Sequence, residues 1–415
     1  MQERKQIKAK TDKALKPSVF YKPAMFLFGL YMRVFRRLHA DRSGIKGIKP
    51  PYVIVVNHQS FFDFGAVVYL FRKDPPTFVV STHFFRDKVF RIGLKLGGCI
   101  PKRQFFPDLS SVRKMLRVVR SGRSIAIFPE GQISTIGENT EIDPSIGKLI
   151  KTLGVPVVNA QIRGHSLYSP KWSCGGVFPT RSEVRGSVLL TSEDVERMSD
   201  SEIAEKITQA VSYNEYEWQR SVMHRSSKPR TLEGLENVLW LCPKCGKEHT
   251  MQSSGRDLFC SACGYRVSTD DYGFLLNSDG SHANMDTPPE WFNWQNDELE
   301  KRLDEGTLLP LSLKGRFLES SVDDFSEHGY VCHGEGTAVL DKEGLHLDVI
   351  RDGEPFSYDV SPNLTFNLTH SADLCAFDIP GNTKEDRDFA FDPEDSRDMM
   401  KFIQTWSIIR RRYYS

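Results

Sequence analysis

A histidine and an aspartate with four residues between them are the residues of this sequence best suited to acid–base chemistry. They are His58 and Asp63, in the segment NHQSFFD at 57–63. A carboxylate that accepts a hydrogen bond from one imidazole nitrogen fixes the tautomer and stabilises the imidazolium. The other nitrogen can then take a proton from a hydroxyl. The spacing predicts a general base, although it is equally compatible with two residues that only cap a helix.

The flanking residues indicate how this pair is positioned. An apolar, β-branched run at 52–56 predicts a buried strand. Helix-entry residue types follow, with Ser60 a candidate N-cap. Open α/β sheets keep their sites beyond the carboxyl ends of the strands. We therefore expect the pair at such an edge.

The same alternation of strand and helix continues along the first half of the chain. Predicted strands cover 52–57, 77–81, 124–128, 155–162 and 184–190. Predicted helices cover 63–71, 84–96, 108–120 and 145–153, with a closing helix from 199 to about 220. Strands that alternate with helices predict an α/β fold, a mostly parallel sheet flanked by helices.

Three later segments carry further sequence motifs. They are GCIPKR at 98–103, FPEG at 128–131 and VPVVN at 155–159. Together with 57–63 they resemble, in order and spacing, the four sequence blocks of the glycerolipid acyltransferase family (1-acylglycerol-3-phosphate O-acyltransferase-like). The resemblance covers about the first half of the chain.

The resemblance implies an enzyme that moves a fatty acyl group from acyl-CoA or acyl carrier protein to the hydroxyl of a lysophospholipid. The expected acceptor is 1-acylglycerol 3-phosphate, in phospholipid synthesis. The catalytic residues would be His58 and Asp63, with direct attack and no covalent intermediate. The acceptor would lie against four substrate-binding residues: Lys102, Arg103, Glu130 and Gly131. Of these, the two cations suit a phosphate.

Two positions depart from the family pattern. Ile133 stands where the family has an arginine after FPEG, and Asn159 replaces the last proline of the fourth block. The missing cation leaves the acceptor open between a lysophosphatidate, another lysolipid and a non-phosphorylated alcohol. Arg163 and His165, just past the strand at 155–162, are candidate replacements.

Two Cys-x-x-Cys pairs predict a metal site. Cys242 and Cys245 are separated from Cys260 and Cys263 by fourteen residues, and a glycine follows each pair. Four thiolates at this spacing suit tetrahedral, structural zinc in a zinc ribbon. Redox chemistry is disfavoured because the pairs occur in tandem in a polar context. No catalytic cofactor is expected.

The N-terminal segment, residues 1–45, is basic and contains an apolar stretch at 24–32 followed by arginines. That stretch is shorter than the ~20 residues that span a bilayer. It suits the interface of an anionic membrane, or alternatively a helix packed on the core. With the cysteine usage and no signal-peptide pattern, we expect a cytoplasmic protein, peripheral on the inner face of the cell membrane.

The length of 415 residues predicts two or three domains, and the net charge of +1 favours no particular partner. The expected domains are the acyltransferase domain at 46–225, the ribbon at 235–272, a linker or irregular segment at 273–325 and a β-rich domain at 326–415. The last, closed by a helix, is similar in pattern to pleckstrin-homology-like domains. The expected partners are membrane lipid and acyl donor; the ribbon lacks the basic–aromatic stripe of a nucleic-acid module.

A second function class stays open. A catalytically silent protein would bind lipid or a partner through the ribbon and the C-terminal β-rich domain. The intact His58–Asp63 pair favours the enzyme, whereas Ile133 favours the alternative.

Overall fold

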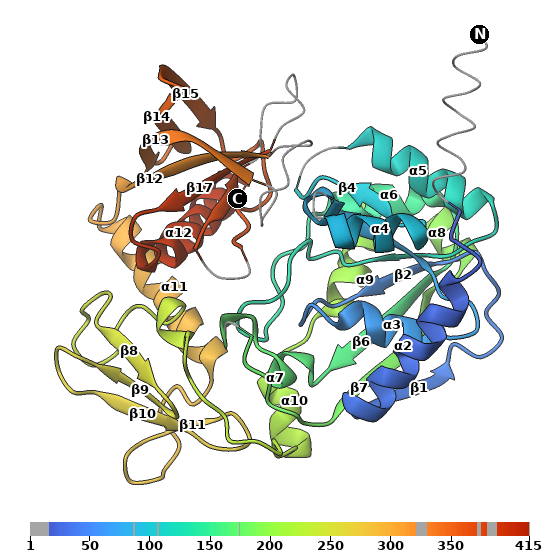
Figure 1. Cartoon of the computed structure of the whole chain (residues 1–415), viewed down its shortest axis with the longest axis horizontal. Helices are drawn as coiled ribbons and strands as arrows, with labels where there is room; N and C mark the ends of the chain where they lie inside the picture. Colours follow the sequence, from blue (N-terminus) through green and yellow to red (C-terminus); the bar gives the residue numbers. More distant parts are fainter. Residues whose placement is uncertain are drawn as a thin grey trace. The chain divides into compact units, whose positions relative to one another are not determined.

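The structure is a computed structural model that describes residues 16–85, 88–105, 108–173, 175–320, 330–371, 375–379 and 388–414. It divides into two compact units (Figure 1). The first comprises residues 1–134, 138–168 and 179–222, and the second comprises 135–137, 169–178 and 223–415. Residues 1–15 of the predicted membrane-interface segment lie outside the described residues. So do 321–325 of the predicted linker and 326–329, 372–374, 380–387 and 415 of the predicted β-rich domain.

The first unit is built on a seven-stranded sheet in the order β1-β7-β6-β2-β5-β3-β4. The strands are β1 (Leu38–Gly44), β2 (Val53–Val56), β3 (Thr77–Ser81), β4 (Ile100–Lys102), β5 (Ile125–Ile127), β6 (Val157–Arg163) and β7 (Ser182–Leu190). Strands β6, β2, β5, β3 and β4 run parallel. Strand β7 is antiparallel to β6, and β1 is parallel to β7. The prediction of a mostly parallel sheet is confirmed.

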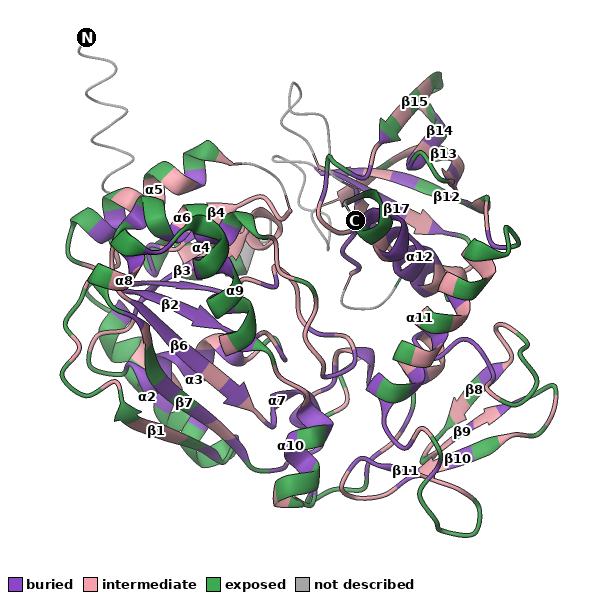
Figure 2. Cartoon of the chain, turned by 180° about the vertical axis from the view of Figure 1, so that it is seen from behind, coloured by how far each residue is buried: buried purple, intermediate pink, exposed green. Residues whose placement is uncertain are grey.

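Helices cover both faces of this sheet. They are α2 (Tyr21–Phe35), α3 (Asp63–Leu70), α4 (Lys88–Leu96), α5 (Leu109–Arg120), α6 (Ser145–Leu153), α7 (His165–Tyr168), α8 (Ser192–Arg197), α9 (Asp200–Val211) and α10 (Glu215–Val222). Alternate residues of β2 belong to different cores: Val53 and Val55 cluster with residues of α5, α6 and α9, and Ile54 and Val56 cluster with residues of α2 and α3. Because both faces are covered, every residue of β2 is buried (Figure 2).

Several elements differ from the sequence expectations. Strand β1 was not predicted, because its polar sequence suits an edge that pairs on one side only. The expected helix at 84–96 is a 3₁₀ turn, Thr82–Phe85, followed by α4, and the closing helix is two helices, α9 and α10. Ser60 is not the N-cap of α3, since that helix begins at Asp63 after Phe62.

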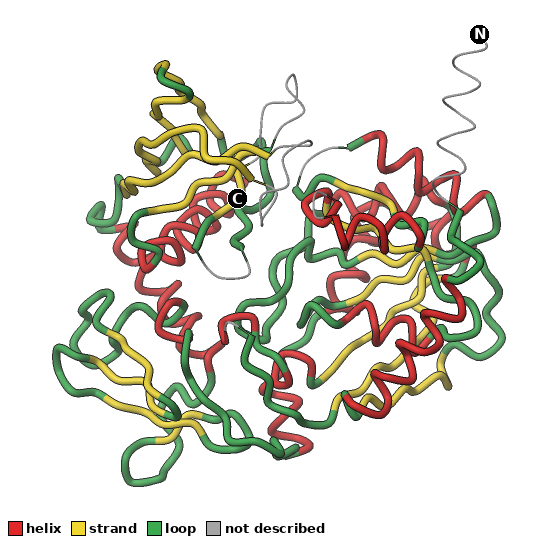
Figure 3. Tube along the Cα trace, in the orientation of Figure 1, coloured by secondary structure: helices red, strands yellow, loops and turns green. Residues whose placement is uncertain are grey.

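Among its described residues, the second unit contains two antiparallel sheets (Figure 3). The ribbon sheet, in the order β11-β10-β9-β8, consists of β8 (Met251–Ser254), β9 (Asp257–Cys260), β10 (Arg266–Thr269) and β11 (Leu275–Leu276). The six-stranded sheet, in the order β15-β14-β13-β12-β17-β16, consists of β12 (Leu311–Ser320), β13 (Tyr330–Leu340), β14 (Leu345–Arg351), β15 (Glu354–Val360), β16 (Phe377–Ile379) and β17 (Phe389–Pro393). Its helices are α11 (Pro288–Asp304) and α12 (Arg397–Tyr414).

The segment 273–325 is not a linker. It contains α11 and β12, and β12 is a central strand that pairs with β13 and β17. The prolines at 288 and 289 suggested an irregular chain, but they occupy the first turn of α11, where a missing N–H costs nothing. Thr287 caps that turn, and Trp291 is fully buried. The C-terminal domain therefore begins before 326.

One hydrophobic core runs through the ribbon, α11, α12 and the six-stranded sheet. Polar contacts reinforce it: Trp240 Nε1 donates to Gln404 Oε1 at 2.7 Å, and Trp291 Nε1 donates to the Leu241 carbonyl at 3.0 Å. Glu248, in the ribbon, pairs with Lys401 of α12 at 2.8 Å. The ribbon thus shares its core with the elements around it.

Candidate functional site

The chain leaves β2 at Asn57, whose side chain continues the sheet where the backbone stops. Its amide donates to the Ile162 carbonyl at 2.8 Å and accepts from the Ile162 N–H at 2.7 Å. These bonds tie the end of β2 to the end of β6 and release the backbone of 58–62 to turn toward α3. His58 therefore lies at the carboxyl edge of the parallel strands, as predicted.

The structure brings His58 and Asp63 together. His58 Nδ1 lies 2.9 Å from Asp63 Oδ2, and the same oxygen accepts from the backbone N–H groups of Gln59 at 2.6 Å and Ser60 at 2.9 Å. Asp63 is fully buried, whereas the His58 side chain is 20% exposed and stacks on Phe128 with ring centroids 4.2 Å apart. With Nδ1 committed to Asp63, the second ring nitrogen is the one left for chemistry.

A second histidine holds the other oxygen of the same carboxylate. His165 Nδ1 lies 2.6 Å from Asp63 Oδ1, and His165 is only 4% exposed. Burial alone would raise the pKa of Asp63, but hydrogen bonds from His165 and His58 outweigh it and hold that pKa below its ordinary value. Asp63 is therefore an anion at neutral pH, although it is buried.

His165 is fixed in turn by a buried glutamate. The Glu215 carboxylate accepts from the backbone N–H groups of Gly164 at 2.6 Å and Ser166 at 3.0 Å, on either side of His165. It also accepts from the Tyr213 hydroxyl at 2.7 Å. Glu215 was not predicted from the sequence. His165 was predicted as a candidate phosphate ligand, which its burial against Asp63 argues against. The rule that strand ends share an edge would have placed His165 near His58.

Glu130 follows β5 and reaches the His58 loop from the other side. It is fully buried; Oε1 accepts from the His58 N–H at 2.7 Å and from Asn139 Nδ2 at 2.8 Å, and Oε2 accepts from the Thr140 N–H at 3.0 Å. Burial raises its pKa to about 8 despite these donors. The sequence analysis expected Glu130 to contact the acceptor, but here its carboxylate binds the backbone of the His58 loop.

The remaining predicted residues lie at the same edge, farther along the sheet. Lys102 ends β4, where burial lowers its pKa and its Nζ donates to the Arg103 carbonyl at 3.0 Å. The next residue, Gln104, donates to the Gly131 carbonyl at 2.6 Å. Gly131 has a φ of +68°, and a Cβ there would lie 2.9 Å from the Phe105 ring. The loop after β4 is thus packed on the loop after β5.

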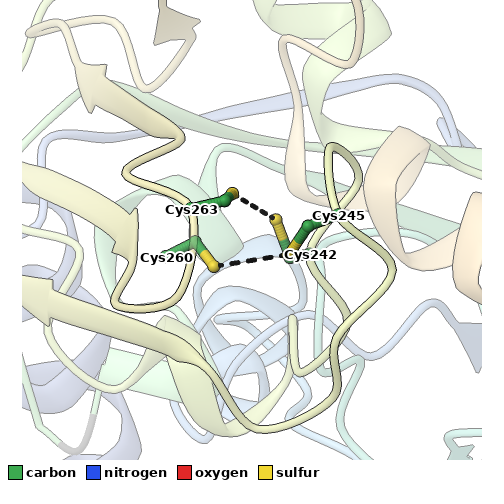
Figure 4. A group of neighbouring side chains, drawn as sticks. All are labelled: Cys242, Cys245, Cys260 and Cys263. Atoms are coloured by element: carbon green, nitrogen blue, oxygen red, sulfur yellow. Dashed lines mark hydrogen bonds between the residues drawn. The ribbon is translucent and has the colours of Figure 1, made fainter.

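The four predicted cysteine ligands form a cluster in the second unit (Figure 4). Their Sγ atoms lie within 4.8 Å of one another, with Cys242 and Cys263 at 3.7 Å and Cys245 and Cys260 at 3.8 Å. A tetrahedron of sulfurs about 2.3 Å from a central ion has edges of about 3.8 Å. The glycine after each pair, at 246 and 264, has a positive φ and closes the knuckle. The donor set fits a single metal ion.

Replacing His165 tests whether its hydrogen bond to Asp63, rather than its bulk, stabilises the first unit. We expect His165→Leu to lower the free energy of unfolding by about 3 kcal/mol, because it leaves a buried carboxylate short of a donor. The loss should be clearly smaller in His165→Asn, whose amide keeps a donor near the position of Nδ1. Urea titration measures both.

The matched control is His39→Leu, at an exposed site of β1, for which a change within about 0.5 kcal/mol is expected. Equal destabilisation by His165→Leu and His165→Asn would show that packing, and not the contact with Asp63, is what the side chain supplies.

The part of the chain that carries these residues is similar to known proteins. The family described as Acyltransferase matches residues 35–163. The chloroplastic 1-acyl-sn-glycerol-3-phosphate acyltransferase BAT2 of Brassica napus is 26% identical over 180 residues, 39% of this chain and 49% of the relative. The chain therefore spans about half the length of that curated relative.

Two solved structures are more distant. The 1-acyl-sn-glycerophosphate acyltransferase PlsC of Thermotoga maritima is 16% identical, with a TM-score of 0.40 over 46% of this chain and 76% of its own. The RAN binding domain of the nuclear pore component NUP2 of Ashbya gossypii is 15% identical, with a TM-score of 0.19 over 25% and 97%. Neither similarity is high enough to support an argument about the fold. The family match spans β1 to β6 and includes His58, Asp63 and Glu130, so this part of the chain is similar to an acyltransferase domain.

Proposed function

We propose that the chain is an O-acyltransferase that moves a fatty acyl group from acyl-CoA or acyl carrier protein to the hydroxyl of a lysophospholipid, in phospholipid synthesis. The acceptor that we favour is 1-acylglycerol 3-phosphate. The observation that carries the proposal is the contact of His58 Nδ1 with Asp63, which is buried and held by three further donors. A partly exposed imidazole backed by a buried anion is suited to deprotonating an alcohol.

In this mechanism the free nitrogen of His58 takes the proton of the acceptor hydroxyl as the oxygen attacks the thioester carbonyl. The new C–O bond gives a tetrahedral intermediate, and its collapse breaks the C–S bond. The departing thiolate takes the proton back from the imidazolium, which restores His58. Asp63 stays ionised throughout and stabilises the imidazolium, because opposite charges at 2.9 Å in a buried site interact strongly.

The other residues of the site would position these two or bind substrate. Glu130 and Asn57 hold the start of the His58 loop to the loop after β5 and to β6, so we assign them positioning roles. Arg103 and Gly131 stay proposals as acceptor contacts. Lys102 is less suited to bind an anionic group, since burial lowers its pKa and disfavours its charged form.

Replacing His58 tests the chemistry directly. We expect His58→Ala to lower kcat by about 10²–10⁴-fold, the usual contribution of a general base. The assay uses labelled acyl-CoA and acyl carrier protein donors against a panel of lysolipids. His39→Ala, at an exposed position, is the control. Turnover that survives in His58→Ala would reject the mechanism, and a wild-type chain that acylates nothing in the panel would favour the silent lipid-binding alternative.

Helix α2 carries an apolar outer face that suits a membrane surface. This outer face consists of Phe26, Leu27, Leu30, Tyr31, Val34 and Phe35, which are 40–67% exposed. The opposite side, with Gly29 and Met32, is buried. In the described residues, no helix has the length and apolar character needed to cross a bilayer. We propose that the outer face, flanked by the exposed Lys22, Arg33 and Arg37, lies on anionic lipid at the inner face of the cell membrane, as a peripheral, cytoplasmic contact.

A charged outer face should release the chain from lipid. We expect Leu27→Glu/Val34→Glu to bind vesicles of phosphatidylcholine and phosphatidylglycerol at least about tenfold more weakly, because each buried apolar side chain is worth about 1.5–3 kcal/mol. Vesicle flotation measures the bound fraction. Val188→Glu, at an exposed apolar position of β7, should bind like wild type. Undiminished binding of the double variant would rule out α2 as the contact.

We further propose that the cysteine cluster holds one structural zinc ion, in a zinc ribbon. The short sulfur–sulfur distances from two knuckles support this assignment. When bound, zinc would link the two knuckles covalently through Cys242, Cys245, Cys260 and Cys263. Because the ribbon shares a core with α11 and α12, the ion would also stabilise those helices.

Metal analysis of a reduced preparation should find about one zinc per chain. Cys260→Ser should lose that zinc and unfold at a lower urea concentration, since metal binding contributes to folding. Cys332→Ser, an exposed cysteine of the same unit, should keep both zinc and stability. A zinc-free, fully stable wild-type chain would contradict the assignment.

A further inference from the structure

Arg36 is a buried cation whose guanidinium contacts aromatic rings instead of an anion. The residue is only 7% exposed. Its Cζ lies 3.7 Å from the centroid of the Phe62 ring and 4.1 Å from that of the Tyr168 ring. A guanidinium that stacks on rings keeps its N–H groups directed outward in its own plane, where they can still donate.

The backbone places this side chain at the edge of the sheet that carries His58. Arg36 follows the last residue of α2, and Arg37 then adopts a φ of +49°, which is rare for a residue with a Cβ. The Ser182 hydroxyl donates to the Arg36 carbonyl at 3.3 Å. Because β1 runs antiparallel to β6 and β2, the chain enters β1 at the edge where those strands end.

Within the described part of the chain, no hydrogen-bond acceptor contacts the Arg36 guanidinium. Other arginines of this unit differ: Arg163 donates to Glu183 and Gln161, and Arg42 donates to the Leu70 carbonyl at 2.9 Å. None of its nitrogens is fully enclosed without a partner, so its N–H groups reach solvent, but a largely buried charge without a counter-ion is still unfavourable. The cation–π contacts offset only part of that cost. A bound anion would supply the missing acceptors.

The rings that hold Arg36 belong to the catalytic segments. Phe62 immediately precedes Asp63, and Tyr168 ends α7, the helix that begins with His165. The alternatives considered for a missing phosphate ligand are occupied: Arg163 pairs with Glu183, and His165 is buried on Asp63. Ile133 brings no charge to the site. Arg36 is therefore a cation beside the Asp63 segment that can bind an anionic substrate group.

We propose that Arg36 binds a phosphate group of a substrate at the acyltransferase site, with two N–H groups donating to two phosphate oxygens. The phosphate is that of the lysophospholipid acceptor or that of the acyl donor. The geometry of planar, paired donors matches a phosphate better than a single point charge does. This proposal depends on the proposed acyl transfer for the identity of the substrate. The presence of an anion site at Arg36 does not depend on it.

Steady-state kinetics distinguish the two sources. For Arg36→Met we expect KM for lysophosphatidate to rise by about tenfold or more, the usual effect of losing a hydrogen bond to a charged group. The KM for monoacylglycerol and for acyl-CoA should change less than twofold. A rise confined to acyl-CoA would instead assign the donor phosphate. Equal losses with lysophosphatidate and monoacylglycerol at an unchanged donor KM, or no loss at all, would overturn the proposal.

A binding measurement separates this proposal from the proposed reaction. Calorimetric titration with glycerol 3-phosphate should show binding to wild type and at least about tenfold weaker binding to Arg36→Met. Arg120→Met, at an exposed arginine that ends α5, should bind like wild type. If no acceptor turns over but this difference persists, the acyltransferase function fails and the phosphate site stands. Equal binding by wild type and Arg36→Met, or no binding by wild type, would overturn the site for an acceptor phosphate, and together with an unchanged KM for acyl-CoA it would overturn the site altogether.

A second variant guards against misfolding. Arg36→Lys keeps a cation over the two rings but lacks the paired donors, so it should fold as wild type does by circular dichroism and bind glycerol 3-phosphate with intermediate affinity. Wild-type affinity in a folded Arg36→Lys would show that charge alone is enough and would overturn the paired-donor geometry.

Discussion

The structure of the site depends on one buried carboxylate. Asp63 accepts hydrogen bonds from two imidazoles and two backbone N–H groups, and these donors compensate for the loss of water around its charge. Because its pKa is lower in the folded chain than in the unfolded chain, the stabilisation is present at neutral pH and is lost as the pH falls through the lowered pKa. The same anion orients His58, so the stability of the loop and its chemistry have a common origin.

Three neighbouring strands brace the loop that carries this pair. Asn57 joins the end of β2 to β6, and Glu130 joins the His58 N–H to the loop after β5. Glu215 holds the backbone around His165, so it supports Asp63 from behind. Each brace is a buried polar side chain bonded to backbone, which fixes position more tightly than a side-chain pair at the surface. A preorganised base of this kind needs little rearrangement when substrate arrives.

The structural features that depend on a short stretch of sequence could be predicted from the sequence. The apolar run at 52–56, followed by the histidine and aspartate, was enough to place His58 at the sheet edge. His165 lies 102 residues from Asp63, and its contact depends on the order of β2 and β6, which no local pattern encodes. Helix α11 was missed because its two prolines suggested a break rather than a first turn. Arg36 is buried beside the turn between α2 and β1, where Arg37 has a positive φ, and no local pattern indicates this burial.

The central claim is that Asp63 makes His58 a base, and the most direct test is the rate of acyl transfer by Asp63→Asn. This change keeps the shape of the side chain but removes its charge and reverses the donor at one position, which favours the wrong tautomer of His58. The account predicts a fall in kcat of about 10²–10⁴-fold in folded protein. A folded Asp63→Asn that transfers acyl groups at the wild-type rate would contradict it.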